Sequence, residues 1–352
     1  MTTSEKVGVE VPEVEDRGSR GRATALATAA AALLLSLAAA CAAPPGPGGP
    51  GGAGRPVSEA RAADDAGGGI GPLAEPERCD GQRSAAESLA PARIVGDAVA
   101  DIRERGRLRV GIDLNSYLWG YREPGSTDIV GFDIDLVQAI AEDLLGPDPE
   151  ITYLAIPTVQ RIDAVRAGQV DMVVRTMSIT CERWNQVAFS TAYFETGQQL
   201  LVPSGSEITG FDDSVAGQRL CRADGTTAAR LLDRQDHGAE VVRVANHLDC
   251  LVRIQLGLAD ALMTDSALAA GHVAQDPSMR LVGDPLTMES YGVAMNQDNP
   301  DLVRWVNAVL EDYRAGGVTS DWRASYDTWL AEYLYDQRND PPPLPPEPLY
   351  RE

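Results

Sequence analysis

Apolar positions in the central part of the chain follow two alternating patterns, short continuous runs and runs at helical spacing. Residues 107–112 (RLRVGI) and 150–156 (EITYLAI) read as strands, and residues 170–174 (VDMVV) read as a buried strand. Residues 132–146 (FDIDLVQAIAEDLLG) repeat apolar positions at helical spacing and stop at a glycine. The alternation predicts an α/β fold with mostly parallel sheets flanked by helices.

The same order repeats in a second unit. Strand patterns alternate there with helical patterns, in the order 218–223, 224–235, 240–245, 247–257, 260–264 and 265–276. In open α/β sheets, ligands bind in the crevice outside the carboxyl ends of the strands. Polar residues that follow predicted strands are therefore candidate site residues: Asp113, Thr176, Ser178 and Asp265.

Length and charge limit the function classes. A chain of 352 residues with 44% hydrophobic residues can bury more than one small core, which favours two lobes or domains. The formal net charge of -22 argues against nucleic-acid binding, because nucleic-acid-binding proteins present a basic face.

The amino-terminal segment is typical of an exported lipoprotein. Residues 23–40 are an apolar run with arginines before it and Cys41 directly after it, so residues 1–41 read as a signal peptide that ends at a lipidated cysteine. A transmembrane anchor is the alternative, although the run is at the short limit for spanning a bilayer. Residues 42–96 begin rich in Pro, Gly and Ala and are predicted to be a flexible linker. The Pro-rich tail, residues 336–352, should be extended, so both ends are expected to lie outside the fold.

Export changes how the remaining cysteines are interpreted, because disulfides form in oxidising compartments. Cys221 and Cys250 flank one structural unit and are predicted to pair, which leaves Cys79 to pair with Cys181. Reduced buried thiols are the alternative. No histidine lies at metal-ligand spacing from any cysteine, so we expect no zinc or other metal site.

The segment TMSITCERW (176–184) places a cation where a helix begins. Thr180 is a good N-cap, and Arg183 falls in the first turn, near the positive end of the helix dipole. A negatively charged ligand beside Arg183 would explain this position. The alternative is a surface arginine paired with Glu182.

Segments 131–144 (GFDIDLVQAIAEDL), 175–202, 224–232 (DGTTAARLL) and 257–271 (GLADALMTDSALAAG) occur together in one order and spacing. In these segments the chain resembles the amino-acid-binding proteins of bacterial ABC importers, the polar amino acid branch of the periplasmic binding proteins. The resemblance covers nearly all of residues 97–335. Within the family, three segments are most similar in sequence to the glutamine-binding lipoproteins of actinobacteria: 101–113 (DIRERGRLRVGID), 176–184 (TMSITCERW) and 249–255 (DCLVRIQ).

The resemblance implies the type 2 periplasmic-binding-protein fold, in which two α/β lobes are joined by two hinge strands and close around a ligand. Lobe 1 would comprise residues 97–200 and 289–335, and lobe 2 residues 204–286. The crossings would lie near residues 198–204 and 287–293.

The resemblance also implies roles for site residues. Arg183 would grip the α-carboxylate of an amino acid with its guanidinium fork. Ser178 and Thr176 match positions that supply hydroxyl and backbone donors. Thr227 matches a position that donates to the same carboxylate from a helix start, with Thr226 as a second candidate.

The family match assigns Asp265 to the α-ammonium of the ligand. Without that match, Asp265 would read as the N-cap of the helix that follows it.

Arg161 lies fifteen residues before Thr176, a spacing that resembles the binders of acidic amino acids, where this arginine meets the side-chain carboxylate. Counting Arg161 and Arg183 against Asp265 leaves one net positive charge, which glutamate or aspartate would neutralise. We therefore expect glutamate or aspartate as the ligand, with glutamine or asparagine as weaker competitors. An exposed Arg161 paired with Asp163 is the alternative.

Aromatic residues follow Asp113 where the family places walls against the aliphatic part of the ligand. The chain lacks the proline usual in that loop, and among Tyr117, Trp119 and Tyr121 we predict that Trp119 is the wall. Asp113 itself is included among the ligand-binding residues.

Three functions fit the resemblance. The first is a lipid-anchored receptor on the extracytoplasmic face of the cell membrane that presents an amino acid to the permease of an ABC importer. The second is the same clamp acting as an amino acid sensor for a membrane signalling protein. The third, a dehydratase-like enzyme, is not favoured, because Asp113 is the only candidate general acid or base to which the resemblance gives no role in gripping the ligand, and the sequence shows no Ser/His/Asp set or metal cluster. We expect a monomer that is not an enzyme and needs no cofactor.

Overall fold

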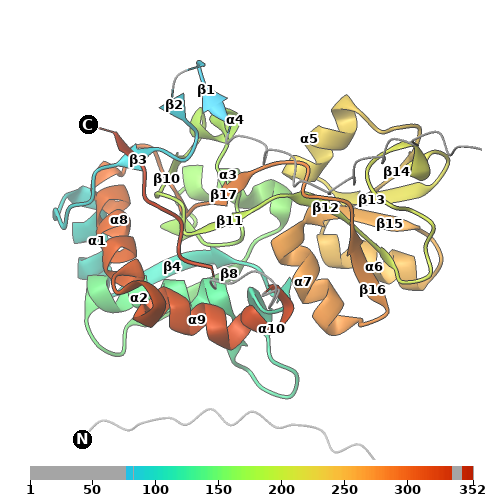
Figure 1. Ribbon diagram of the computed structural model, residues 1–352. Coiled ribbons are helices and arrows are strands. Elements are labelled where there is room, and N and C mark those ends of the chain that lie inside the picture. The colour runs from blue at the N-terminus through green and yellow to red at the C-terminus, as the bar shows by residue number, and fades with distance from the viewer. Residues whose placement is uncertain (1–76, 82, 335–342, 352) are drawn as a thin grey trace, which may run out of the picture. The chain divides into compact units, whose positions relative to one another are not determined.

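Two five-stranded sheets form the centre of the computed structural model, which describes residues 77–81, 83–334 and 343–351 (Figure 1). All of them belong to one compact unit, Gly67–Glu352. The sheet of lobe 1 has the order β10-β18-β9-β4-β8. Its strands are β4 (Arg107–Ile112), β8 (Glu150–Ala155), β9 (Met172–Val173), β10 (Ala188–Phe189) and β18 (Ala294–Met295).

The sheet of lobe 2 has the order β14-β13-β15-β12-β16. Its strands are β12 (Gln198–Pro203), β13 (Arg219–Ala223), β14 (Glu240–Val244), β15 (Ala261–Asp265) and β16 (Met279–Val282). A small three-stranded sheet beside lobe 1 consists of β5 (Asn115–Ser116), β6 (Gly120–Arg122) and β7 (Ile129–Val130).

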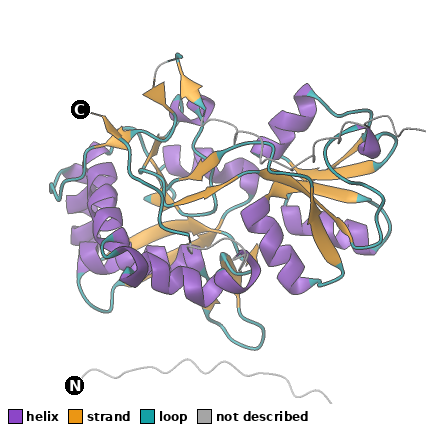
Figure 2. Ribbon diagram, viewed as in Figure 1, coloured by secondary structure: helices purple, strands orange, loops and turns teal. Residues whose placement is uncertain are grey.

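Helices flank both sheets (Figure 2). Those of lobe 1 are α1 (Asp97–Arg105), α2 (Phe132–Leu145), α3 (Arg161–Arg166), α4 (Cys181–Trp184), α8 (Pro300–Arg314), α9 (Asp321–Trp329) and α10 (Ala331–Leu334). Those of lobe 2 are α5 (Thr227–Arg234), α6 (His247–Gln255) and α7 (Ser266–Gln275). Among the residues that the structure describes, no helix has both the length and the apolar character needed to cross a membrane.

Two crossing strands, β11 (Phe194–Thr196) and β17 (Glu289–Tyr291), pair antiparallel between the lobes. They lie close to the predicted crossings. Each leads directly into a sheet, β11 into β12 and β17 into β18, and both β12 and β18 pair antiparallel with their neighbours. The sheets are therefore mixed, whereas we expected mostly parallel ones. In each of these sheets only the two pairs at one end are parallel, β4 with β8 and β9 and β13 with β14 and β15.

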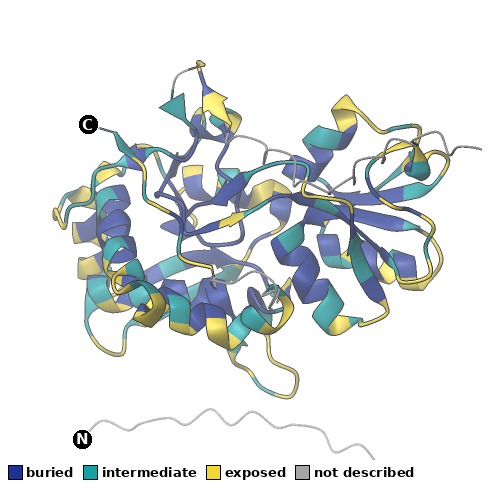
Figure 3. Cartoon of the chain, viewed as in Figure 1, coloured by how far each residue is buried: buried dark blue, intermediate teal, exposed yellow. Residues whose placement is uncertain are grey.

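Both faces of the lobe 2 sheet are buried (Figure 3). In β12, Leu200 and Val202 pack into one apolar cluster, and Leu201 packs into another on the opposite face. Successive side chains of a strand point to opposite faces, so a continuous apolar run fits a strand covered on both sides. Lobe 1 has a single larger core around β4 and α2.

The expected boundaries of the two ends are wrong. Residues 77–81 and 83–96 are part of the fold rather than a flexible linker, because β3 (Ser88–Leu89) pairs with β19 (Tyr350–Arg351) from the tail. The Arg314 guanidinium also donates to the Pro346 carbonyl at 2.7 Å. Extended Pro-rich chain lacks internal hydrogen bonds, but lobe 1 supplies partners here. The predicted signal peptide and Cys41 lie outside the described residues.

The remaining two strands before lobe 1, β1 (Arg78–Cys79) and β2 (Arg83–Ser84), form a short hairpin. A disulfide joins Cys79 to Cys181 at the start of α4, and a second joins Cys221 in β13 to Cys250 in α6. Both pairings match the expectation from the sequence. The first ties the segment before lobe 1 to the helix that carries Arg183.

We expect the Cys221→Ala/Cys250→Ala variant to lose about 3–4 kcal/mol of unfolding free energy. The disulfide joins cysteines 29 residues apart in sequence. In the chain-entropy model, removing a crosslink of this length lowers the free energy of the unfolded chain by about that amount, because the chain gains conformational entropy. Urea denaturation of the variant beside the wild-type protein measures the loss. An unchanged urea midpoint would show that this crosslink does not stabilise lobe 2.

Candidate ligand-binding site

A small cavity lies between the lobes, and all but two of the predicted ligand-binding residues line it. The predicted residues in its wall are Arg161, Thr176, Ser178, Arg183, Thr226, Thr227 and Asp265. Its volume is about 20 Å³, which holds about one water molecule. A ligand the size of an amino acid can therefore enter only if the lobes separate or the lining side chains move.

Arg183 is buried in this wall and is not a surface residue. The Thr180 hydroxyl caps α4 by accepting from the Arg183 backbone N–H at 3.2 Å. The guanidinium donates to the Ser178 carbonyl at 2.5 Å and, across the cleft, to the Gly225 carbonyl at 3.1 Å. Burial, and then the neighbouring charge of Arg230, lowers the pKa of Arg183 to about 10, so it is protonated at neutral pH.

Arg161 is also buried, at 4% exposure, and does not pair with Asp163 in the structure. Its guanidinium donates to the Thr158 carbonyl at 3.0 Å and to the Gly225 carbonyl at 3.2 Å. Burial, and then the charge of Arg183, lowers its pKa well below the ordinary value. Two buried guanidinium groups thus converge on one neutral carbonyl oxygen.

Asp265 lies at the N-cap position of α7, but its side chain makes no capping hydrogen bond. Its carboxylate instead accepts from the Gln198 side chain, whose amide also donates to the Thr227 hydroxyl at 3.0 Å. Burial, and then the charge of Glu289, raises the pKa of Asp265 well above its ordinary value. A cationic group in the cavity would relieve this energetic cost.

The two neighbouring threonines of lobe 2 have different roles. The Thr226 hydroxyl caps α5 by accepting from the Ala229 N–H at 3.1 Å, and it donates to the Ala223 carbonyl at 2.7 Å. The Thr227 hydroxyl donates to the Glu289 carboxylate at 2.8 Å. Thr226 is therefore committed to the helix end, and Thr227 belongs to the polar network around the cavity.

Thr176 holds a backbone conformation that residues other than glycine seldom adopt, with φ of 41°. Its N–H donates to the Asp133 carboxylate at 3.0 Å, and the Tyr193 hydroxyl donates to the same carboxylate at 2.9 Å. Burial raises the pKa of Asp133 to about 7, against these two hydrogen bonds. Strained backbone of this kind persists where surrounding contacts hold it, often at binding sites.

Asp113 does not line the cavity, contrary to the expectation from the sequence. Its carboxylate forms a buried ion pair with Arg175 at 2.7 Å and accepts from the Ser116 hydroxyl at 2.7 Å. Burial alone would raise the pKa of Asp113, but Arg175, then His247 and the Ser116 hydroxyl, hold it below its ordinary value. A carboxylate held in this way is a poor general base.

Trp119 is likewise not a wall of the cavity. It is fully buried in an aromatic cluster, with ring centroids 4.8 Å from Phe194 and 5.6 Å from Tyr291, and its indole N–H donates to the Ala267 carbonyl at 3.0 Å. It packs lobe 1 against the crossing strands. Loop sequence alone did not reveal which ring faced the core.

Several lining residues were not predicted: Thr158, Arg175, Gln198 and His247. The His247 ring comes from the first turn of α6, and its Nε2 lies 3.0 Å from the Ser116 hydroxyl of lobe 1. Because Ser116 gives its only proton to Asp113, Nε2 must donate this bond. A lone histidine at a helix start carried no signal, but Arg175 directly follows a predicted strand and could have been found by that rule.

The buried histidines predict acid sensitivity. Burial lowers the pKa of His247 to about 4, against the pull of Asp113, so the folded protein keeps it neutral while the unfolded chain takes up a proton below about pH 6.5. Its contribution to stability is therefore complete above pH 6.5 and is lost as the pH falls toward 4. Lowering the pH from 7 to 4.5 should reduce the unfolding free energy of the wild-type protein. In His247→Gln, which retains a donor toward Ser116, we expect this reduction to be about 2–3 kcal/mol smaller than in wild type.

Urea denaturation at both pH values measures this difference. His237→Asn is the control, because His237 lies on a partly exposed loop in the left-handed conformation that asparagine tolerates. An equal acid loss in wild type and His247→Gln would contradict the prediction.

Comparison with known proteins gives one consistent result. Residues 108–332 match the family described as bacterial extracellular solute-binding proteins, family 3. The chain is 31% identical over 236 residues to the ABC transporter glutamine-binding protein GlnH of Bacillus subtilis, covering 67% of this chain and 85% of that protein. It is 29% identical to the glutamate-binding protein GluB of Corynebacterium efficiens, covering 68% and 82%.

Solved structures agree. The solute receptor for L-cysteine of Neisseria gonorrhoeae superimposes with a TM-score of 0.65 at 25% identity, over 71% of this chain and 99% of that chain.

Proposed function

Because the chain belongs to the bacterial extracellular solute-binding proteins, family 3, we propose that it is a receptor that closes its two lobes around glutamate or aspartate. Glutamine and asparagine are weaker ligands in this proposal. The receptor presents the amino acid to the membrane permease of an ABC importer. The lipid anchor at Cys41, on the extracytoplasmic face of the cell membrane, is part of the same proposal.

The observation that carries the choice of ligand is the pair of buried guanidinium groups, Arg161 and Arg183. In the part of the chain that the structure describes, neither forms an ion pair with a carboxylate, and both donate to the Gly225 carbonyl. Burying cations without counter-charge is costly. A ligand with two carboxylates can supply one to each guanidinium, whereas an amide ligand supplies only one.

Net charge alone does not support this choice. The sequence-based count set Arg161 and Arg183 against Asp265, but Glu289 is also buried beside Thr227 and Ser178. With Glu289 included, the two cations and two anions cancel. The preference for an acidic ligand therefore depends on the position of Arg161. The relatives named above include both glutamine-binding and glutamate-binding proteins, so they do not distinguish an amide ligand from an acidic one.

Replacing Arg161 tests the proposal. We expect Arg161→Ala to lower the affinity for L-glutamate at least tenfold, about 1.4 kcal/mol. The ratio of the affinities for L-glutamate and L-glutamine should also become smaller. Isothermal titration calorimetry of protein stripped of bound ligand by unfolding and refolding measures both constants. Arg166→Ala, at an exposed position of the same helix, is the matched control and should bind as the wild type does.

Two results would count against the assignment. If Arg161→Ala bound glutamate within about threefold of wild type, roughly 0.7 kcal/mol, Arg161 would not meet the ligand. If the wild-type protein bound glutamine more tightly than glutamate, the acidic ligand would be wrong, while the receptor proposal would stand.

A further inference from the structure

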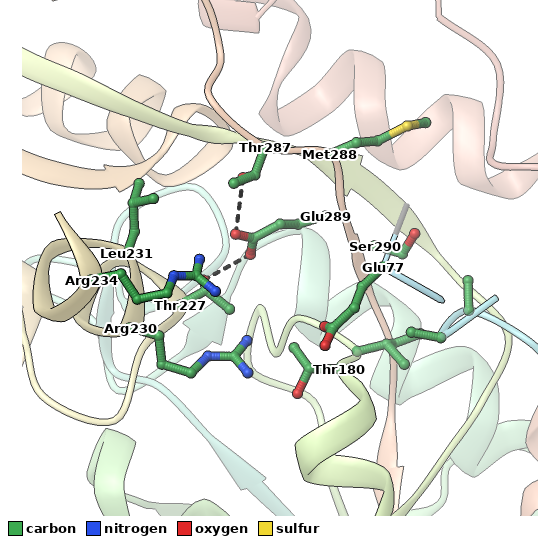
Figure 4. A pocket seen from close by; sticks show the side chains of 13 residues that line it. Glu77, Thr180, Thr227, Arg230, Leu231, Arg234, Thr287, Met288, Glu289 and Ser290 are labelled. Carbon is green, nitrogen blue, oxygen red and sulfur yellow. Dashed lines mark hydrogen bonds between the residues drawn. The ribbon is translucent and has the colours of Figure 1, made fainter. Parts of the chain in front are cut away.

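Glu289 is a buried carboxylate on the crossing strand β17. It is 9% exposed. Three hydroxyl groups donate to it: Ser178 of lobe 1 at 2.6 Å, Thr227 of lobe 2 at 2.8 Å and Thr287 at 3.0 Å. Figure 4 shows the bonds from Thr227 and Thr287, with the side chain pointing from β17 toward α5.

The bonds from Ser178 and Thr227 to Glu289 determine whether these two hydroxyls can donate a hydrogen bond to a ligand. Each hydroxyl has one proton, and a carboxylate oxygen only accepts. The Ser178 and Thr227 protons both go to Oε2 of Glu289, so neither hydroxyl can donate to a ligand. Thr227 already accepts from the Gln198 amide. What remains is lone pairs, which suit a ligand ammonium and not a ligand carboxylate.

The charges of this wall point in the same direction. Asp265, linked to Thr227 through the Gln198 amide, adds a second buried carboxylate. Asp265 lines the cavity, and Glu289 lies outside its lining but in contact with two lining residues, Ser178 and Thr227. The described donors to Glu289 are all uncharged hydroxyls. No direct ion pair among the described residues therefore neutralises its negative charge.

We propose that Glu289 is a positioning residue that makes the site require an α-ammonium group. By taking the protons of Ser178 and Thr227, it turns both hydroxyls into acceptors from opposite lobes, so the clamp selects amino acids against carboxylic acids of the same length that lack the amine. In this proposal the hydroxyls of Ser178 and Thr227 do not donate to the α-carboxylate, which is left to Arg183 and backbone donors. The inference rests on the proposed function.

The test compares ligands that differ only in the amine. Calorimetry, with competition titration for weak ligands, gives the affinity of wild type and Glu289→Gln for L-glutamate and for glutarate. If wild type prefers L-glutamine, that ligand and its deaminated analogue glutaramate are used instead. We expect Glu289→Gln to lower the affinity for the amino acid at least tenfold and to leave that for the deaminated acid unchanged or higher.

A merely structural role would weaken both ligands equally, and an unchanged ratio of the two affinities overturns the inference while the receptor function stands. Binding of no amino acid by the wild type would overturn both. Glu289→Ala frees both hydroxyls to donate, so it should also lower the affinity for the amino acid relative to that for the deaminated acid. This variant replaces Glu289→Gln in the test if Glu289→Gln does not fold. Thr287→Val removes the donor to the other carboxylate oxygen and the acceptor of the Gln198 backbone N–H, but it leaves the bonds from Ser178 and Thr227 to Glu289. It should leave the ratio of the two affinities within about threefold of wild type, about 0.7 kcal/mol.

Discussion

Arg183→Ala should reduce the affinity for the preferred amino acid at least 100-fold, about 2.7 kcal/mol. Hydrogen bonds to a charged group contribute roughly 1.5–3 kcal/mol each, and a guanidinium fork can make two of them to one carboxylate. The Arg183 guanidinium is buried in the wall of the cavity and bonds to carbonyl oxygens of both lobes. Its removal takes away the donor that we propose for the α-carboxylate and one contact between the lobes.

Titration calorimetry of Arg183→Ala against L-glutamate, L-aspartate and L-glutamine measures the loss, with circular dichroism to confirm folding. Arg230→Ala is the control. Arg230 is a partly exposed arginine that pairs with Glu182 at 3.1 Å on the rim, and exposed pairs of this kind contribute about 0–1 kcal/mol. We expect it to bind normally. Affinity of Arg183→Ala within threefold of wild type would remove Arg183 from the site.

Asp113→Asn should destabilise the fold by about 3–5 kcal/mol. The Asp113–Arg175 pair is almost fully buried, with side chains 5% and 2% exposed. Asparagine keeps an oxygen for the backbone N–H groups of Leu114 and Asn115, but it leaves the Arg175 guanidinium without a counter-charge. Removing one partner of a buried ion pair leaves an uncompensated charge, which costs more than the pair itself contributes.

Urea denaturation of three variants separates this effect from lost packing. The double variant Asp113→Asn/Arg175→Met should recover much of the lost stability, because it removes both charges. Glu182→Ala, which breaks an exposed pair, should change the unfolding free energy by less than about 1 kcal/mol. A loss below about 1 kcal/mol in Asp113→Asn would mean that water reaches Arg175.

Much of the fold could be predicted from local patterns. The alternation of strand and helix, the Thr180 cap, the helix starts at residues 227 and 247 and the grouping of Arg183 with Ser178 all depend on neighbours within a few residues. Apolar periodicity and capping act at that range, so the sequence itself carries them. Both disulfides were predicted from spacing and export.

The sequence did not show which polar groups would meet. Asp113 was expected at the ligand, yet Arg175 pairs with it. Glu289 comes to Ser178 across 111 residues of sequence separation and to Thr227 across 62. The pairing of β3 with β19 likewise joins opposite ends of the chain.

The sequence by itself therefore determined many of the elements, the family and seven of the sixteen residues that line the cavity. Only the tertiary structure decided which of the buried charges in the described residues form ion pairs and which do not. The physical reason is that the balance between burial and pairing of a charge is set by groups distant along the chain, which meet when the crossing strands bring the two lobes together.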